Sequence, residues 1–167
     1  MISNKAFKYI ENNSFLLKED KFKEFFDKCN DFYLKRELAE FLLLDCDINF
    51  LEYMKSIPNH LFYKSNRLVE LSIPESIIEI ENNVFENCRS LKSITMLDSI
   101  NKIDENAFYG CLALWSIEIP NSVNEIGHNT FFNCNNLKEI KIPKKLNSKV
   151  DLEFIGINEN KTKIIWY

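Results

Sequence analysis

The sequence is poor in the residues from which catalytic and metal sites are usually built. It has three glycines and two histidines, and its five cysteines include no CxxC pair. Scarce glycine argues against a phosphate-cradling loop, and the cysteines lack the spacing of a zinc site or a disulfide framework. His60 and His128 fall at non-equivalent turn positions, so we do not expect them to meet. We therefore expect no enzyme, no metal site and no cofactor.

Long apolar runs and clustered basic residues are missing as well. No stretch approaches the roughly 18 apolar residues of a membrane span, and the N-terminus lacks the apolar core of a signal peptide. The net charge is −4, and without a basic cluster this argues against a nucleic-acid partner. We expect a cytoplasmic protein with no nucleic-acid partner and no membrane span.

What the sequence does contain is a repeat with a constant step between Leu68 and Ile142, as in 108 − 85 = 23 and 131 − 108 = 23. Three columns keep this step: Phe85, Phe108 and Phe131; Cys88, Cys111 and Cys134; and Leu68, Leu91, Leu114 and Leu137. Self-similarity at such a period signals a solenoid, because each unit can bury its apolar face only against its neighbours. We predict that the phenylalanines stack and that the cysteines are buried free thiols.

Within one unit the apolar positions follow the form LxxIxI and predict a short, half-buried strand. Proline donates no backbone hydrogen bond, so the ladder should end where it follows the strand, at Pro74, Pro120 and Pro143. A column directly before the cysteine holds residues that tolerate a left-handed backbone: Asn87, Gly110 and Asn133. We predict a forced turn there.

The run from Ile119 to Pro143, IPNSVNEIGHNTFFNCNNLKEIKIP, resembles the BspA-like class of leucine-rich repeat, whose usual unit is close to LxxIxIPxSVxxIGxxAFxxCxx. The resemblance extends from Leu68 to about Leu146, and a fainter copy lies one repeat step upstream, at Ile48, Phe50, Met54, Ile57 and Phe62. It implies an α/β fold, a leucine-rich repeat solenoid of about four to five short units with an N-terminal helical cap. It also implies a protein-binding or adhesive surface rather than catalysis.

Three segments are predicted: a helical cap over residues 1–47, the solenoid over 48–152 and a C-terminal cap over 153–167. The cap should contain a short helix around Ala6 to Ile10 and a helix from about Asp20. A further helix should turn apolar residues inward: Leu34, Leu38, Phe41, Leu42 and Leu43. This segment is either a cap alone or itself a partner-binding element.

At the C-terminus, EFIGI and KIIWY predict a hairpin that closes the open edge of the solenoid. The repeat pattern fails after Leu146, although Phe154 still stands in line with Phe131, 154 − 131 = 23, and this remnant is expected to cap the solenoid. Trp166 and Tyr167 either pack over the last unit, which we favour, or remain exposed.

Residues between the LxxIxI positions should point outward, and they supply the candidate binding residues. Trp115 falls between Lys92 and Lys138 in one outward column, and Glu118 lies in another. Tryptophan is enriched at binding hot spots, although its ring could instead lie on the two lysine stems. A second exposed aromatic row lies beside the phenylalanine turn and is interrupted by Glu86: Tyr63, Tyr109 and Phe132, of which the last two are the candidates.

We therefore predict a non-enzymatic protein–protein interaction module that binds another protein through its repeat surface. An inhibitor of a host factor is one form of this function. The alternative is a structural or adhesive surface protein in which the repeats act as a spacer or as a cell- or matrix-binding surface.

Overall fold

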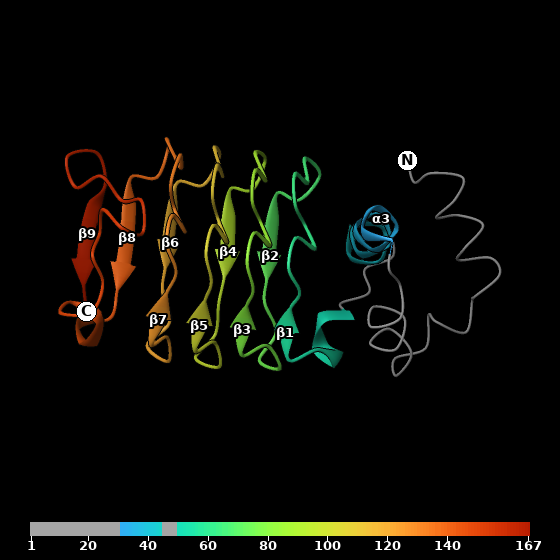
Figure 1. Ribbon diagram of the computed structural model, residues 1–167, viewed down its shortest axis with the longest axis horizontal. Helices are drawn as coiled ribbons and strands as arrows, with labels where there is room; N and C mark the ends of the chain where they lie inside the picture. The colour runs from blue at the N-terminus through green and yellow to red at the C-terminus, as the bar shows by residue number, and fades with distance from the viewer. Residues whose placement is uncertain (1–30, 45–49) are drawn as a thin grey trace.

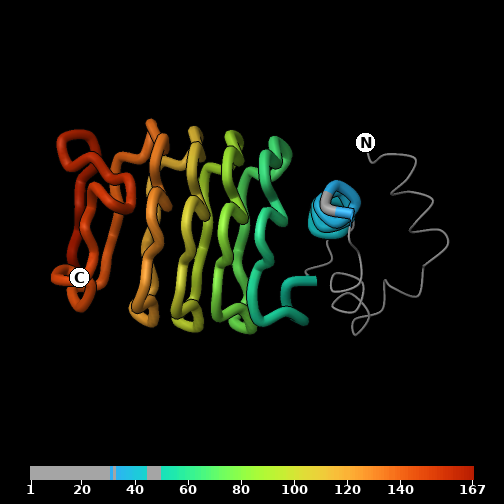
Figure 2. Tube along the Cα trace, viewed as in Figure 1, coloured from blue at the N-terminus to red at the C-terminus, as the bar shows by residue number. Residues whose placement is uncertain are grey.

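The computed structural model describes residues 31–44 and 50–167. The chain forms a parallel β-solenoid of about five turns, with one helix at its N-terminal end (Figure 1). The coils lie side by side along the long axis of the molecule, and the helix follows the first coil on that axis (Figure 2). The predicted solenoid architecture is confirmed.

Two rows of parallel strands run along the solenoid. The short-strand sheet contains β1 (Ser56–Ile57), β3 (Glu79–Ile80), β5 (Lys102–Ile103) and β7 (Glu125–Ile126). The long-strand face contains β2 (Glu70–Ser72), β4 (Ser93–Thr95), β6 (Ser116–Glu118), β8 (Glu139–Ile142) and β9 (Lys163–Trp166). Two short 3-10 helices, η2 (Phe50–Tyr53) and η3 (Lys144–Leu146), lie near the two ends. Leu71 pairs with Ile94, 94 − 71 = 23, so the sequence repeat is the strand register.

The core is a column of stacked aromatic rings enclosed by the strand residues. Phe62, Phe85, Phe108 and Phe131 are fully or almost fully buried. Their successive ring centroids lie 5.6, 5.2 and 5.6 Å apart with nearly parallel planes. These spacings lie within the range of offset-stacked aromatic pairs. The predicted phenylalanine stack is confirmed, and the upstream copy supplies its first ring.

Left-handed backbone shapes the turn of every coil. Asn87, Gly110 and Asn133 have φ of 57°, 69° and 61°, which confirms the predicted forced turn. A second left-handed column, four residues earlier, was not predicted: His60, Asn83, Asn106 and Asn129, with φ of 62°, 57°, 54° and 54°. Asparagine adopts this region at lower cost than most residues, so both columns fit the sequence except at Lys64, which shares the column of Asn87 and has φ of 57°.

Each repeat cysteine fastens its coil to the preceding one. The thiols of Cys88, Cys111 and Cys134 donate to the phenylalanine carbonyl oxygens of the coil before, over 2.9, 3.2 and 3.1 Å. All three are free and buried, as predicted. Burial raises the pKa of Cys88 and Cys134 to about 12. It also raises the pKa of Cys111 well above its ordinary value.

The long-strand face is divided between β4 and β6. The short-strand sheet is continuous, whereas β2–β4 and β6–β8–β9 form separate hydrogen-bonded sheets. Ile73 and Ile119 donate across to Thr95 and Lys141, but no such bond links Met96 to the next coil among the described residues. We call this discontinuity the β4–β6 break.

The unit at the break departs from the repeat at its corner. Leu97 stands in the column of Pro74 and Pro120, so the proline ring that fixes φ is missing there. The serine of this corner also lacks the usual partner: within the part of the chain that the structure describes, the buried Ser99 hydroxyl makes no hydrogen bond. The equivalent Ser122 hydroxyl donates to the Ile100 carbonyl over 2.5 Å.

At the N-terminal end, α3 (Phe32–Leu44) confirms the further helix. Asp31 caps it, because its Oδ1 accepts from the Leu34 N–H over 3.0 Å. Its apolar face joins the core of the first coil, with Leu34, Leu38, Ala39 and Leu42 buried and Phe41 and Leu43 packed beside them. The Arg36 guanidinium donates to the Tyr63 carbonyl over 3.1 Å. The helices predicted at Asp20 and at Ala6 to Ile10 lie outside the described residues.

The predicted C-terminal hairpin is wrong. The segment instead adds another parallel rung, with Ile164 of β9 opposite Ile140 of β8. The offset is 164 − 140 = 24, one more than the repeat step. Because of this slip Phe154 is 50% exposed beside His128, and Ile155 is buried in its place.

The last two aromatic residues differ in how far they are buried. Trp166 is partly buried against the core, as expected. Tyr167 is 42% exposed, and its hydroxyl donates to the Ile119 carbonyl over 2.7 Å. The segment boundaries after residues 47 and 152 stay predictions.

Candidate interaction surface

Trp115 lies on the outside of the long-strand face, directly before β6. It is 60% exposed, so most of its side chain is not covered by the chain itself. Lys138 is exposed beside it and donates its backbone N–H to the Trp115 carbonyl over 2.8 Å, and Lys92 is exposed at the equivalent position before β4. The exposure expected from the repeat register is confirmed. A role of these residues in binding stays a prediction.

Ion pairs cross the long-strand face between neighbouring coils. Lys141 Nζ lies 2.9 Å from Glu118 Oε2, and Lys163 Nζ lies 3.3 Å from Glu139 Oε2. The hydrogen bond to Glu118 raises the pKa of Lys141. Both pairs are solvent-exposed and contribute little to stability. The two pairs neutralise the lysines that take part in them. Lys92 and Lys138, by contrast, belong to no ion pair of the described residues.

A cavity of about 490 Å³ opens at the β4–β6 break. Its lining comes from both sides of the break and from the C-terminus: Ile94, Thr95, Met96, Leu97, Asp98, Glu118, Pro120, Asn121 and Tyr167. Asp98 Oδ1 accepts from the Asn121 N–H over 2.9 Å. The pKa of Tyr167 is raised by burial first and then by the charges of Glu118 and Asp98. The lining therefore combines apolar contact with negative charge.

Sequence reasoning missed this cavity. The only signal was Leu97 in the proline column, which marks an irregular corner but does not say that two strands part. Of the residues proposed from the sequence, Glu118 alone lines the cavity. Trp115 lies three residues before Glu118, on the β6 side of the break.

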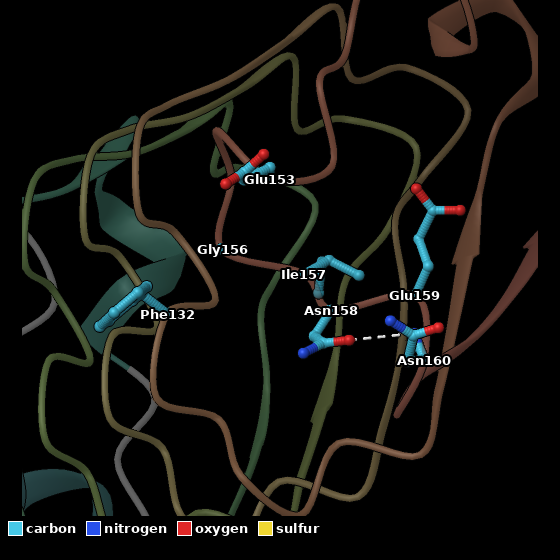
Figure 3. Close-up of a pocket in the computed structure, with 7 residues that line it drawn as sticks. All are labelled: Phe132, Glu153, Gly156, Ile157, Asn158, Glu159 and Asn160. Carbon is cyan, nitrogen blue, oxygen red and sulfur yellow. Dashed lines mark hydrogen bonds between the residues drawn. The ribbon is translucent and has the colours of Figure 1, made fainter.

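Tyr109 and Phe132 form a second surface in the turns. Their rings stack at 5.7 Å with 22° between planes, and the Asn133 amide donates to the Tyr109 hydroxyl over 3.0 Å. Phe132 is 46% exposed. It borders an open cavity of about 380 Å³ whose other residues come from the last coil: Glu153, Gly156, Ile157, Asn158, Glu159 and Asn160 (Figure 3). The structure thus brings Tyr109 and Phe132 together, and this cavity shares no lining residue with the one at the break.

The side chains on these surfaces are suited to noncovalent contacts. Within residues 31–44 and 50–167, no group of three or more His, Cys, Asp and Glu side chains could hold a metal ion. The same part of the chain contains no helix long and apolar enough to cross a membrane. The repeat thiols are buried with raised pKa values, the opposite of what a nucleophilic cysteine needs.

The comparison with protein families is decisive for the repeat. Six copies of the BspA type leucine-rich repeat region match residues 55–165. The chain belongs to this family. Membership in the BspA-type leucine-rich repeat family accounts for the strand register, the proline corners and the phenylalanine and cysteine columns.

Solved structures resembling this BspA-type protein are bacterial leucine-rich repeat proteins. The pneumococcal vaccine antigen PcpA is 26% identical over 55% of this chain and 22% of its own, with a TM-score of 0.53. A leucine-rich cell surface protein from Faecalibacterium prausnitzii is 36% identical over 47% of this chain and 21% of its own, with a TM-score of 0.45. A leucine-rich repeat protein from Bacteroides capillosus is 31% identical over 52% of this chain and 61% of its own, at 0.48.

This chain thus spans about a fifth of the length of the first two proteins. The comparison with curated proteins finds no match. The likeness to PcpA supports the solenoid, and no partner follows from it.

Proposed function

We propose that this BspA-type repeat protein is a non-enzymatic binding module that docks another protein on its long-strand face. The observation that carries the proposal is the exposure of Trp115, whose side chain is 60% exposed directly before β6, on the long-strand face beside the β4–β6 break. A tryptophan in that position adds nothing to the stacked core, and its burial against a partner would remove a large apolar surface from water.

Two further features favour this face. Lys92 and Lys138 flank Trp115 and take part in no ion pair among the described residues, so their positive charge would help to orient a partner. The β4–β6 break leaves the N–H groups of Met96 and Trp115 without backbone acceptors in the described residues, so they are free to bond a partner. Following the expectation of a cytoplasmic protein, the partner would be intracellular, and blocking a host factor would be one such role.

Affinity capture followed by measured binding tests this function. Trp115→Ala should weaken binding of the captured partner by about thirtyfold, which corresponds to about 2 kcal/mol, while leaving the melting temperature unchanged. Val69→Ala is the matched control, because Val69 occupies the same outward column two coils away and is 39% exposed. It should leave affinity unaltered.

The other outcomes redirect the proposal. Unaltered binding by Trp115→Ala would reject the Trp115 site, and Tyr109→Ala combined with Phe132→Ala would then test the aromatic row. Retention on extracellular matrix or cell surfaces without a stoichiometric protein partner would favour the adhesive alternative.

A further inference from the structure

The outer edge of β9 carries unpaired backbone groups. Among the described residues β9 pairs with β8 alone. Lys163 donates its N–H to Lys138 and Tyr167 donates to Ile142, so both turn their backbone groups toward β8. Because successive residues of a strand alternate, Ile165 also faces β8, whereas Ile164 and Trp166 direct their N–H and C=O groups away from the solenoid.

The side chains of this edge offer little protection against strand pairing. Natural sheet edges are usually blunted by charges, proline or bulges. β9 has the sequence Lys-Ile-Ile-Trp, and its one charge, Lys163, is paired with Glu139. Ile165 lies opposite Lys141 in an outward column, while Ile164 and Trp166 pack partly on the core. The edge is therefore short, apolar and rich in β-branched residues.

The coil that carries β9 departs from the repeat. Ile155 replaces the stacked phenylalanine, and the strand register exceeds the repeat step by one position.

We propose that the β9 edge pairs with the β9 edge of a second copy of this chain, antiparallel about a twofold axis at Ile165. This register places Ile164 opposite Trp166 of the second copy, and the reverse. All four outward groups of each strand are then bonded, since these two positions form hydrogen-bonded pairs and Ile165 forms the non-hydrogen-bonded pair between them. The result is an isologous dimer with a sheet continuous across the axis.

The charges favour a second copy as the occupant. In this register Lys163 falls opposite Tyr167 of the second copy rather than opposite another lysine. An ammonium beside an electron-rich ring is an attractive pair. The two Ile165 side chains meet at the axis, where an apolar β-branched pair is favourable. The edge is thus complementary to itself in hydrogen bonding, shape and charge.

The first test measures molar mass by light scattering over a range of protein concentrations. The unaltered chain should form a dimer, and Ile165→Lys should shift it to monomer, because two ammonium groups would lie directly opposite at the axis. Thr95→Lys is the matched control: it introduces the same charge in the same outward column of β4 and should leave the dimer intact. A monomer at all concentrations, or a dimer that Ile165→Lys does not weaken, would overturn the proposal.

The second test fixes the register and stays informative if Ile165→Lys fails to fold. In a non-hydrogen-bonded antiparallel pair the Cα atoms lie about 4.5 Å apart, within the range that a disulfide spans. Mild oxidation should therefore cross-link Ile165→Cys across the axis. Lys163→Cys is the control, because its two copies would lie about 13 Å apart along the strands. Equal cross-linking at the two positions, or none at position 165, would overturn the register.

Discussion

At the scale of single residues, stability is concentrated in two columns that run through every coil. The phenylalanine rings fill the interior, and each cysteine thiol adds a second hydrogen bond to the phenylalanine carbonyl of the coil before, which already accepts a backbone N–H of its own coil. A small apolar residue at the cysteine position would fill the space but leave that carbonyl without the thiol donor. The preference for cysteine therefore has a hydrogen-bonding reason as well as a packing reason.

The stack predicts the effect of removing its central ring. Phe108 is fully buried, with Phe85 and Phe131 at 5.2 and 5.6 Å. Phe108→Ala should lower the free energy of unfolding by about 3 to 5 kcal/mol, because it deletes a large side chain between two rings that cannot close the gap. Urea denaturation measures this loss. A loss below about 1 kcal/mol would contradict the role of the stack.

The thiols predict an alkaline loss of stability. For Cys134 the pKa is about 12 in the folded chain, against an ordinary 9.0. Below pH 9 both states keep the proton, so the contribution is full. Above it the unfolded chain loses the proton while the folded chain keeps it, and the free energy of unfolding falls by up to about 1.4 kcal/mol per pH unit for each thiol.

Cys134→Ala isolates this effect from other groups that titrate in the same range. Denaturation at about pH 8.5, 9.5 and 10.5 should show a shallower decline for the variant than for the unaltered chain. Parallel declines would mean that the Cys134 thiol is not shielded in the folded state.

At the scale of elements, the turns are set by left-handed residues, and two glycines occupy such positions for different reasons. Gly110 has φ of 69° in the column of Asn87 and Asn133, so asparagine is already tolerated there. A Cβ at Gly110 would meet the mobile end of the Asn87 side chain at 2.6 Å. A Cβ at Gly156, with φ of 85°, would meet the Phe132 backbone N and Cα at 2.5 and 2.6 Å.

The same substitution should therefore have unequal effects at these two sites. Gly110→Asn is expected to change the free energy of unfolding by less than about 0.5 kcal/mol. Gly156→Asn should cost about 1 to 3 kcal/mol or more, because the backbone of the neighbouring coil must move. Thermal and urea denaturation of the two variants provide the comparison. Equal losses would show that the close approach of Gly156 to Phe132 is unimportant.

Features that recur at the repeat step could be predicted from the sequence, whereas features that depart from this step were missed. Phe62 precedes Phe85 by the repeat step and entered the stack as expected. Phe154 stands in line with Phe131 but does not enter the stack, because one extra residue moves a side chain to the other face of the chain. The helix of residues 32–44 was predicted from its apolar spacing, and only the structure shows that Asp31 caps it.

The candidate surface likewise has one feature that follows the repeat and was predicted, and one that breaks it and was missed. The exposure of Trp115 follows from counting residues along a regular repeat, so the sequence was enough. The cavity between Leu97 and Glu118 depends on two strands failing to pair, which is a tertiary event that no residue spacing encodes.

At the scale of the whole molecule, the two rows of strands differ in continuity. The short-strand sheet runs unbroken from β1 to β7, whereas the long-strand face parts between β4 and β6. The core stack passes beneath the break without interruption, since Phe85, Phe108 and Phe131 keep their spacing. At the break the coils are therefore joined by the core, by the short-strand sheet and by backbone hydrogen bonds between the turns, such as that from the Phe108 N–H to the Thr130 carbonyl.

Amide hydrogen exchange should reveal the break. The N–H groups of Met96 and Trp115 should exchange at least about tenfold faster than those of Ile73 and Lys138, which donate to Thr95 and Trp115 at equivalent positions. Equal protection of the four amides would mean that β4 and β6 pair in solution.

The links between coils also bear on how the chain is made. The Phe62 N–H donates to the Val84 carbonyl, and the Cys88 thiol donates back to Phe62. The hydrogen bonds of a coil are thus complete only after the following repeat has left the ribosome. Each new coil then folds against the coil before it. During synthesis the growing chain accordingly exposes one unfinished coil at a time to the proteins around it, with α3 already covering the first.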